Sequence, residues 1–197
     1  GSLTYAFEQH AVFIEKGVRR MHPSAPVFAH NSVISSECAI QLGVHGPVMV
    51  VSSACTSSTD AIGLGAGMIA SGLLDAVLVG GADAPLTPPL FGAFDRLSMM
   101  PRSFNAAAAQ AARPFDRHRE GLVLGEGAVT FVLESEESAC ARGARPVAVV
   151  RGYGASCDAH SHFRQEASGA DAIRAIATAF RSAGCGPRDI QLVSAHG

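Results

Sequence analysis

The stretch at residues 48–63 constrains the fold more than any other part of this chain. It opens with four apolar residues, 48–51, which predict a short buried strand. A hydroxyl-rich step follows, and residues 61–74, rich in alanine, glycine and leucine, predict a helix with little polar surface. Residues 74–83 predict a second strand. A strand–helix–strand unit of this kind indicates an α/β protein with a parallel sheet.

Cys55 lies at the junction between the first strand and the helix of this unit. N–H groups converge at the start of a helix, and their partial positive charge favours the thiolate form of a nearby cysteine. A cysteine at such a place can act as a nucleophile. A free cysteine is also among the residue types that are most often buried. The residues of this stretch alone leave both interpretations open.

Composition excludes several classes of protein. A chain of 197 residues can bury one sizeable core or part of a larger one, and only 16% of its residues are charged, so we expect extra surface to be buried between subunits or against further chain. The net charge of −2 argues against nucleic acid as a partner, and no apolar run is long enough for a membrane span. Five cysteines without CxxC spacing favour a reducing compartment, and we expect a cytoplasmic protein.

The spacing of apolar residues predicts the remaining elements. Helices are expected at 3–16, 26–42, 134–142 and 167–184, with a shorter helical stretch within 86–100. Strands are expected at 122–134, as a pair broken by glycine, and at 146–154 and 190–194. Cys157, His160 and His162 share one predicted loop, but they lack the separated ligand pairs of common zinc sites, so no metal site is expected there.

Several motifs follow one another along the chain in a family-like order. They are EKGVRR at 15–20, GVHGP at 43–47, VSSACTSS at 51–58, GGAD at 80–83, RPFD at 113–116, GLVLGEGA at 121–128 and AHG at 195–197. Together they resemble the β-ketoacyl-acyl-carrier-protein synthases, or ketosynthases, of the thiolase-like superfamily. In their details, these motifs are similar to those of the fatty-acid-elongating and type II polyketide branches of the family.

The resemblance implies a thiolase-like α/β fold with a layered αβαβα architecture, of which this chain would hold an incomplete, central portion. Residues 1–135 would form the end of the N-terminal half, and residues 145–197 the start of the C-terminal half. A threonine-containing loop, a lysine, a second catalytic histidine and a glycine-rich loop would follow residue 197. The fragment is therefore expected to be inactive unless it is complemented.

The resemblance also implies a reaction. Cys55 matches the family's nucleophile, which takes an acyl group from an acyl carrier protein before a decarboxylated malonyl thioester attacks it. His196 matches the first of the two catalytic histidines, which would donate a hydrogen bond to the malonyl thioester oxygen as charge develops there. Ala54, Leu90 and Phe94 match positions that line the acyl pocket. Phe94 would act as a gate, and Leu90, larger than in close relatives, would shorten the tunnel.

The implied partners are an acyl carrier protein, which carries the phosphopantetheine arm, and a second chain. The second chain could be identical to this one, which gives a homodimer. It could instead be a chain-length-factor-like or complementing ketosynthase chain, which gives a heterodimer. The resemblance implies no metal or organic cofactor, and no membrane or nucleic acid partner. Two alternatives remain open: a non-catalytic interaction module that keeps only the central portion of the fold, and another thiolase-superfamily enzyme that uses coenzyme A thioesters.

Overall fold

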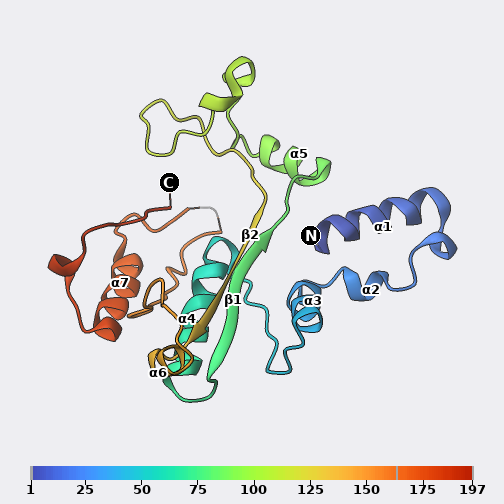
Figure 1. Cartoon of the computed structure of the whole chain (residues 1–197). Helices are drawn as coiled ribbons and strands as arrows, with labels where there is room; N and C mark the ends of the chain where they lie inside the picture. The colour runs from blue at the N-terminus through green and yellow to red at the C-terminus, as the bar shows by residue number, and fades with distance from the viewer. Residues whose placement is uncertain (1, 163, 197) are drawn as a thin grey trace. The chain divides into compact units, whose positions relative to one another are not determined.

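The computed structural model describes residues 2–162 and 164–196 (Figure 1). These residues form two compact units. Unit 1 contains residues 2–50 and 82–129, and unit 2 contains residues 51–81 and 130–196. We describe the elements of each unit in turn.

Helices provide most of the regular structure of unit 1. Their bounds are α1 (Ser2–Lys16), η1 (Val18–Arg20), α2 (Ala25–Phe28), α3 (Ser32–Leu42), α5 (Pro88–Arg96) and η3 (Asn105–Gln110). The helix predicted at 3–16 is confirmed as α1. The helix predicted at 26–42 is divided into α2 and α3, because the N–H of His30 bonds to the Val27 carbonyl, 3.3 Å away, in a tight turn that ends α2.

Unit 2 contains the helix that follows Cys55. The bounds of its helices are η2 (Ala54–Thr56), α4 (Ser57–Ala70), α6 (Glu136–Ala141), α7 (Ala170–Ala183) and η4 (Pro187–Asp189). The helices predicted at 61–74, 134–142 and 167–184 are confirmed as α4, α6 and α7. Gly143 and Gly184 terminate α6 and α7, with φ values of +72° and +64° that L-residues rarely adopt.

The strands of the structure are β1 (Ala76–Asp83) and β2 (Gly127–Glu134), which pair in a two-stranded sheet. They run in opposite directions, because β1 leads to α5 at one end of the ladder and β2 leads to α6 at the other (Figure 1). This ladder is not the pairing predicted for the strand–helix–strand unit, in which residues 48–51 would lie parallel to residues 74–83; that pairing is not formed among the described residues, because residues 48–51 are not a strand there. The strand predicted at 74–83 is confirmed as β1, and the pair predicted at 122–134 is a single strand, β2.

Three predicted strands, at 48–51, 146–154 and 190–194, are not strands in the structure. A strand needs a neighbouring strand to accept and donate its backbone hydrogen bonds. Among the described residues, the only ladder is the one between β1 and β2, so these three segments have no such neighbour. The pattern of apolar residues in these segments is typical of strands, but the pattern does not determine which neighbouring strand, if any, they pair with.

Apolar side chains are widely exposed. In β2, Val129, Phe131 and Val132 have exposed fractions of 59%, 50% and 62%. Surfaces of this kind usually contact more protein. The low proportion of charged residues in the sequence agrees with this exposure.

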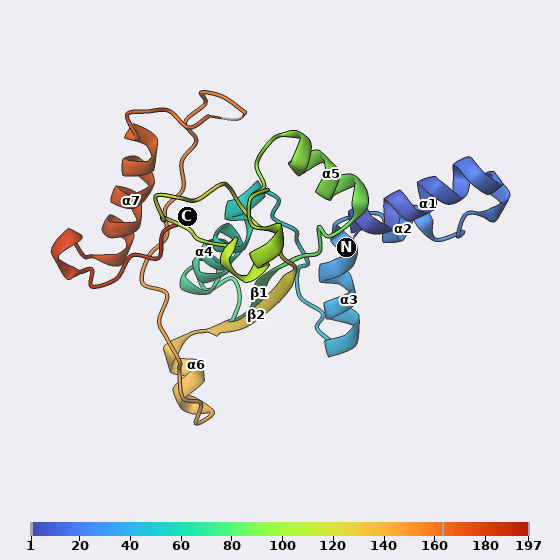
Figure 2. The ribbon, with the colours of Figure 1, turned by 90° about the horizontal axis from the view of Figure 1, so that it is seen from above.

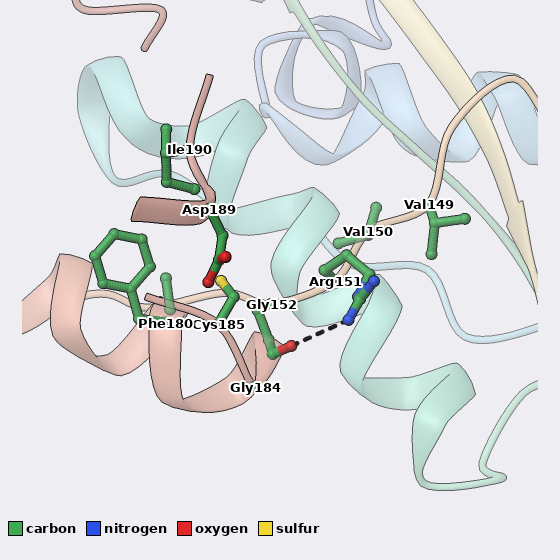
Figure 3. Close-up of a pocket in the computed structure, with 11 residues that line it drawn as sticks. Val149, Val150, Arg151, Gly152, Phe180, Gly184, Cys185, Asp189 and Ile190 are labelled. Carbon is green, nitrogen blue, oxygen red and sulfur yellow. Dashed lines mark hydrogen bonds between the residues drawn. The ribbon is translucent and has the colours of Figure 1, made fainter. Parts of the chain in front are cut away.

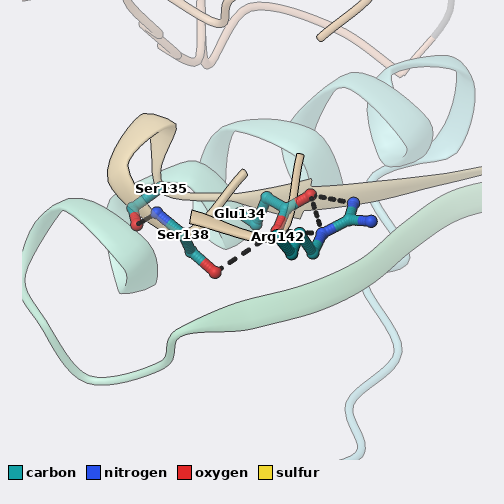
Figure 4. Close-up of polar contacts among 4 residues, drawn as sticks. All are labelled: Glu134, Ser135, Ser138 and Arg142. Carbon is teal, nitrogen blue, oxygen red and sulfur yellow. Dashed lines mark hydrogen bonds and ion pairs between the residues drawn. The ribbon is translucent and has the colours of Figure 1, made fainter. Parts of the chain in front are cut away.

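Polar contacts join the end of β2 to α6 (Figure 4). Ser135 caps the helix, because its hydroxyl oxygen accepts a hydrogen bond from the N–H of Ser138, 3.1 Å away. Arg142 pairs with Glu134, with Nε 2.9 Å from Oε2. The hydrogen bond from the Arg142 guanidinium lowers the pKa of Glu134. These contacts fix the place where the chain leaves the sheet.

Glycine lets α4 lie close against β1 (Figure 2). A Cβ atom at Gly65 would lie 2.6 Å from Cγ1 of Val79, which is a buried residue with a stiff side chain. On the same helix, a Cβ atom at Gly67 would meet nothing within 4 Å. The two glycines therefore have different roles, one in packing and one without a packing partner.

We predict opposite effects on stability at these two positions. Gly65→Ala should lower the free energy of unfolding by about 1–3 kcal/mol, because the methyl group overpacks the contact with Val79. Gly67→Ala should raise it by about 0.5–1 kcal/mol, because alanine is the better helix former in open space. Denaturant unfolding of both variants measures the difference, and equal effects would contradict the packing of α4 on β1.

Candidate active site

Cys55 lies in the turn η2, immediately before α4. Its side chain is exposed, so the structure does not support the interpretation of Cys55 as a buried core residue. The position at the start of a helix agrees with the sequence prediction. A thiol at this place is accessible to a reagent and lies next to the helix N–H groups.

The backbone before Cys55 is strained. Ala54 has a φ of +58°, in the left-handed region that costs a non-glycine residue about 1–2 kcal/mol. Ser57 stabilises this turn on both sides: the N–H of Ser53 donates to its Oγ at 2.9 Å, and the same hydroxyl donates to the Ala54 carbonyl at 2.6 Å. The alanine predicted to line the acyl pocket is thus also the residue that shapes the turn.

The carboxylate of Asp60 accepts hydrogen bonds from three hydroxyl groups, two of which belong to this turn. Its Oδ2 atom accepts a hydrogen bond from the hydroxyl of Ser53 and one from Oγ1 of Thr56, 2.8 Å away. Its Oδ1 atom accepts a hydrogen bond from the hydroxyl of Tyr153 at 2.7 Å. The sequence prediction missed this cluster, because Tyr153 stands 93 residues from Asp60 along the chain.

These hydrogen bonds shift both titrating groups away from neutral pH. Those from Ser53, Tyr153 and Thr56 lower the pKa of Asp60 below its usual 3.8. The hydrogen bond to Asp60, together with burial and the carboxylate charge, raises the pKa of Tyr153 to about 12. The contribution of ionised Asp60 to the stability of the folded protein is therefore lost only as the pH falls below 3.8. The contribution of the protonated Tyr153 hydroxyl is lost only as the pH rises from 10 through about 12.

Tyr153 is held between two helices of unit 2. A Cβ atom at Gly63 of α4 would lie 2.2 Å from the Tyr153 ring, so the ring occupies the space that the glycine leaves. On either side of the tyrosine, Cβ atoms at Gly152 and Gly154 would lie 2.5 and 2.1 Å from carbonyl oxygens of α7. Successive side chains of an extended segment point to opposite sides. The glycines therefore face α7 while the tyrosine faces α4.

The other predicted site residues lie in different parts of the chain. His196 is exposed and belongs to unit 2, as do Ala54 and Cys55. Leu90 and Phe94 are half-buried residues of α5 in unit 1, and their spacing of four places them on one face of that helix. The structure thus brings the proposed nucleophile and the histidine into one unit and the two larger pocket residues into the other.

A cavity of about 730 Å³ lies in unit 2, where residues 149–152 face the C-terminal end of α7 (Figure 3). Cys185 and Ile190 contribute to its wall. Arg151 spans one edge, because its Nη2 atom donates to the Ala183 carbonyl at 3.4 Å. Its lining contains none of the predicted site residues within the part of the chain that the structure describes.

Two further features concern ligands and membranes. Among residues 2–162 and 164–196, no group of three or more histidine, cysteine or acidic side chains is placed to hold a metal ion. None of the helices formed by these residues has the length and apolar character needed to cross a membrane.

Comparison with protein families gives two matches. The model of the β-ketoacyl synthase N-terminal domain matches residues 2–139. The model of the β-ketoacyl synthase C-terminal domain matches residues 147–197.

Two curated relatives illustrate the similarity in sequence. The chain is 40% identical over 164 residues to the tetracenomycin polyketide synthase ketoacyl synthase alpha subunit of Streptomyces glaucescens, covering 83% of this chain and 38% of the relative. It is 38% identical over 200 residues to 3-oxoacyl-[acyl-carrier-protein] synthase 2 of Vibrio cholerae, covering 100% of this chain and 47% of the relative. The chain therefore spans less than half the length of these relatives.

Solved structures show the same similarity in fold. A type II PKS acyl-carrier protein in complex with its ketosynthase, bound to the hexaketide, matches with a TM-score of 0.85 and 27% identity, covering 96% of this chain and 48% of that one. The ishigamide ketosynthase/chain length factor matches with a TM-score of 0.82 and 32% identity, covering 96% and 44%. The described elements therefore form part of a thiolase-like α/β fold, as predicted.

Proposed function

Because the chain belongs to the β-ketoacyl synthase family, we propose that it carries the acyl-accepting part of a β-ketoacyl-acyl-carrier-protein synthase. In the first step, the Cys55 thiolate attacks the carbonyl carbon of an acyl-carrier thioester. A thioester to Cys55 forms, and the pantetheine sulfur of the carrier protein leaves as a thiolate as its own bond to the acyl carbon breaks. The observation that carries the proposal is the exposed cysteine at the start of α4, held in a strained turn.

The second step forms a carbon–carbon bond. A malonyl-carrier thioester loses carbon dioxide, and the carbanion that remains attacks the carbonyl carbon of the acyl-cysteine. The new bond forms as the Cys55 thiolate leaves. We propose that His196 donates a hydrogen bond to the malonyl thioester oxygen while negative charge develops there. Since the chain spans less than half the length of its relatives, this step is a proposal for the whole enzyme.

The partners we propose follow from the chemistry and from the relatives. The acyl substrates would arrive on the phosphopantetheine arm of a carrier protein, and no metal or organic cofactor of the enzyme is needed. A second ketosynthase chain, identical or similar to a chain length factor, would complete the assembly, as in the solved relative that contains such a factor. We place the reaction in the cytoplasm, because a free thiol nucleophile needs a reducing compartment.

We propose that Leu90 limits the length of the acyl group, with Phe94 as a gate on the same face of α5. The position of α5 is supported by Glu126, whose Oε1 atom accepts a hydrogen bond from the N–H of Leu86, 2.9 Å away. A leucine in an apolar tunnel excludes the carbon atoms that would otherwise occupy its volume.

We predict that Leu90→Gly lets the enzyme accept longer acyl groups. An acyl chain about two carbons longer than the preferred one should gain about tenfold in kcat/KM, since one methylene in an apolar pocket changes discrimination by at least that factor. The measurement is an acyl-length profile with carrier thioesters. Phe91→Ala is the control, because Phe91 is the next residue of α5 and is 48% exposed. An unchanged profile for Leu90→Gly would reject this role.

A competition between two acyl donors tests the proposed function. The whole enzyme, in which this chain is complemented, is offered the same acyl group on a carrier protein and on coenzyme A, and the mass of the chain that carries Cys55 is followed with time. We expect faster acylation from the carrier thioester, and we expect an inhibitor of the cerulenin type to block it. Faster acylation from the coenzyme A thioester would indicate another thiolase-superfamily activity. The absence of acylation from either donor would indicate a non-catalytic module.

A further inference from the structure

We propose that Asp60 and Tyr153 are positioning residues for Cys55: the tyrosine orients the carboxylate, and the carboxylate holds the turn that presents the thiol. The proposal rests on the proposed role of Cys55 as the acyl-accepting nucleophile. Neither residue is assigned a contact with substrate.

The first argument is the place where the carboxylate binds the turn. Ser53 and Thr56 stand on either side of the two residues Ala54 and Cys55, and both donate hydroxyl hydrogen bonds to the same oxygen, Oδ2 of Asp60. One atom therefore fastens both ends of the segment that carries the thiol. Loss of this acceptor would remove one hydrogen bond at each end of the segment and leave the turn with the bonds of Ser57 and with the contact of Thr56 Oγ1 to the Ser53 carbonyl, 3.0 Å away.

The second argument is the strain in the turn. Ala54 keeps a φ of +58° although alanine disfavours this region. A strained residue persists only where its surroundings over-determine its conformation. The hydroxyl groups bound to Asp60, together with the contacts of Ser57, provide this support. A relaxed turn would place the thiol of Cys55 elsewhere.

The third argument is that Tyr153 has little freedom of its own. Its ring fills the space beside Gly63. Gly152 and Gly154 have no side chain, so the same segment lies close against α7. Its hydroxyl donates to Oδ1 of Asp60, the oxygen that the turn does not use. The tyrosine thus fixes the orientation of the carboxylate by its second oxygen, and the packing of α7 fixes the tyrosine.

The arrangement persists at the pH at which a thioester-forming enzyme works. The phenol of Tyr153 donates a hydrogen bond only while it is protonated, and its pKa is raised to about 12. The carboxylate of Asp60 accepts all three hydrogen bonds only while it is ionised, and these hydrogen bonds lower its pKa. Neither group changes its charge near neutral pH, so the pair is a fixed support and not a switch.

The test measures acyl transfer from a carrier thioester to Cys55 in Tyr153→Phe, Asp60→Asn and the double variant. We expect the rate at saturating thioester to fall about tenfold in Tyr153→Phe and about 100-fold in Asp60→Asn, with little change in the half-saturating concentration, because a misplaced group slows the chemical step. The double variant should be no slower than Asp60→Asn, since the tyrosine acts through the carboxylate. Tyr5→Phe and Asp75→Asn are the matched controls and should retain the original rate.

Two outcomes would overturn the proposal. Rates within twofold of the original protein in both single variants would show that the cluster does not position the thiol. A double variant slowed by the product of the two single effects would show that the residues act independently. Circular dichroism checks that each variant is folded. Alkylation of Cys55 by iodoacetamide is measured in parallel, because it reports on the thiol even if the protein accepts no acyl group and the proposed function fails.

A spectroscopic measurement separates positioning from a general loss of structure. The chain has two tyrosines and no tryptophan, so in a Tyr5→Phe background the ultraviolet absorbance of tyrosinate reports on Tyr153 alone. We expect its ionisation to have a midpoint well above 10, towards the raised pKa of about 12, and to shift towards 10 when Asp60→Asn is added. A midpoint that Asp60→Asn leaves unchanged in the folded protein would contradict the contact.

Discussion

Cys55→Ser is expected to lower the rate of acyl transfer from a carrier thioester by about 1,000-fold or more. A thiol near the start of a helix reacts as the thiolate, whereas a serine hydroxyl keeps its proton and needs an adjacent base to become a nucleophile. In the structure, residue 55 lies immediately before α4 and is exposed, so a carrier thioester can approach the thiol. The effect should appear as the loss of the acyl mass from the intact protein.

The matched controls for this prediction are two other exposed cysteines, Cys140 and Cys157. Serine at either position should leave the rate of acylation unchanged, because neither precedes a helix in a strained turn. If Cys55→Ser still accepts the acyl group at the original rate, Cys55 is not the nucleophile, whichever other residue carries the acyl group.

His196→Ala is expected to separate the two half-reactions in the whole enzyme. Formation of the carbon–carbon bond should slow by about 100- to 1,000-fold, the usual cost of removing one hydrogen-bond donor to a developing oxyanion. The acylation of Cys55 should continue at nearly its original rate, because the malonyl thioester takes part only in the second step. Release of carbon dioxide and the mass of the acyl-enzyme are the two measurements.

His196→Gln tests the chemical role of the same residue. A glutamine amide donates a hydrogen bond but does not exchange a proton near neutral pH. We therefore expect it to restore part of the activity that His196→Ala loses. A glutamine variant as slow as the alanine variant would indicate that the histidine transfers a proton and is not only a hydrogen-bond donor. Equal loss of acylation and condensation in His196→Ala would contradict a role confined to the second step.

The helices could be predicted from the sequence because their hydrogen bonds are local. Apolar spacing located α1, α4, α6 and α7, and the glycines after α6 and α7 marked their ends. The strands were predicted less well. Residues 146–154 and 190–194 have the composition of strands, but whether they form a ladder depends on a partner that their own residues do not specify.

The candidate site could be predicted only in part for the same reason. The motif around Cys55 placed the thiol at the start of a helix, which the structure confirms. The contact between Asp60 and Tyr153 depends on the packing of α4 against residues 152–154, far away in the chain. The positive φ of Ala54 could not be predicted from the sequence either, because alanine is not a residue type that favours positive φ.

Site-resolved mass spectrometry of the acylated protein tests the central proposal most directly. The whole enzyme, in which this chain is complemented, is incubated with an acyl-carrier thioester and digested, and each peptide of this chain that contains one of its five cysteines is examined for the added acyl mass. Our account predicts that the acyl group is found on Cys55 and that Cys38, Cys140, Cys157 and Cys185 remain free. An acyl group on another cysteine, with Cys55 unmodified, would contradict it.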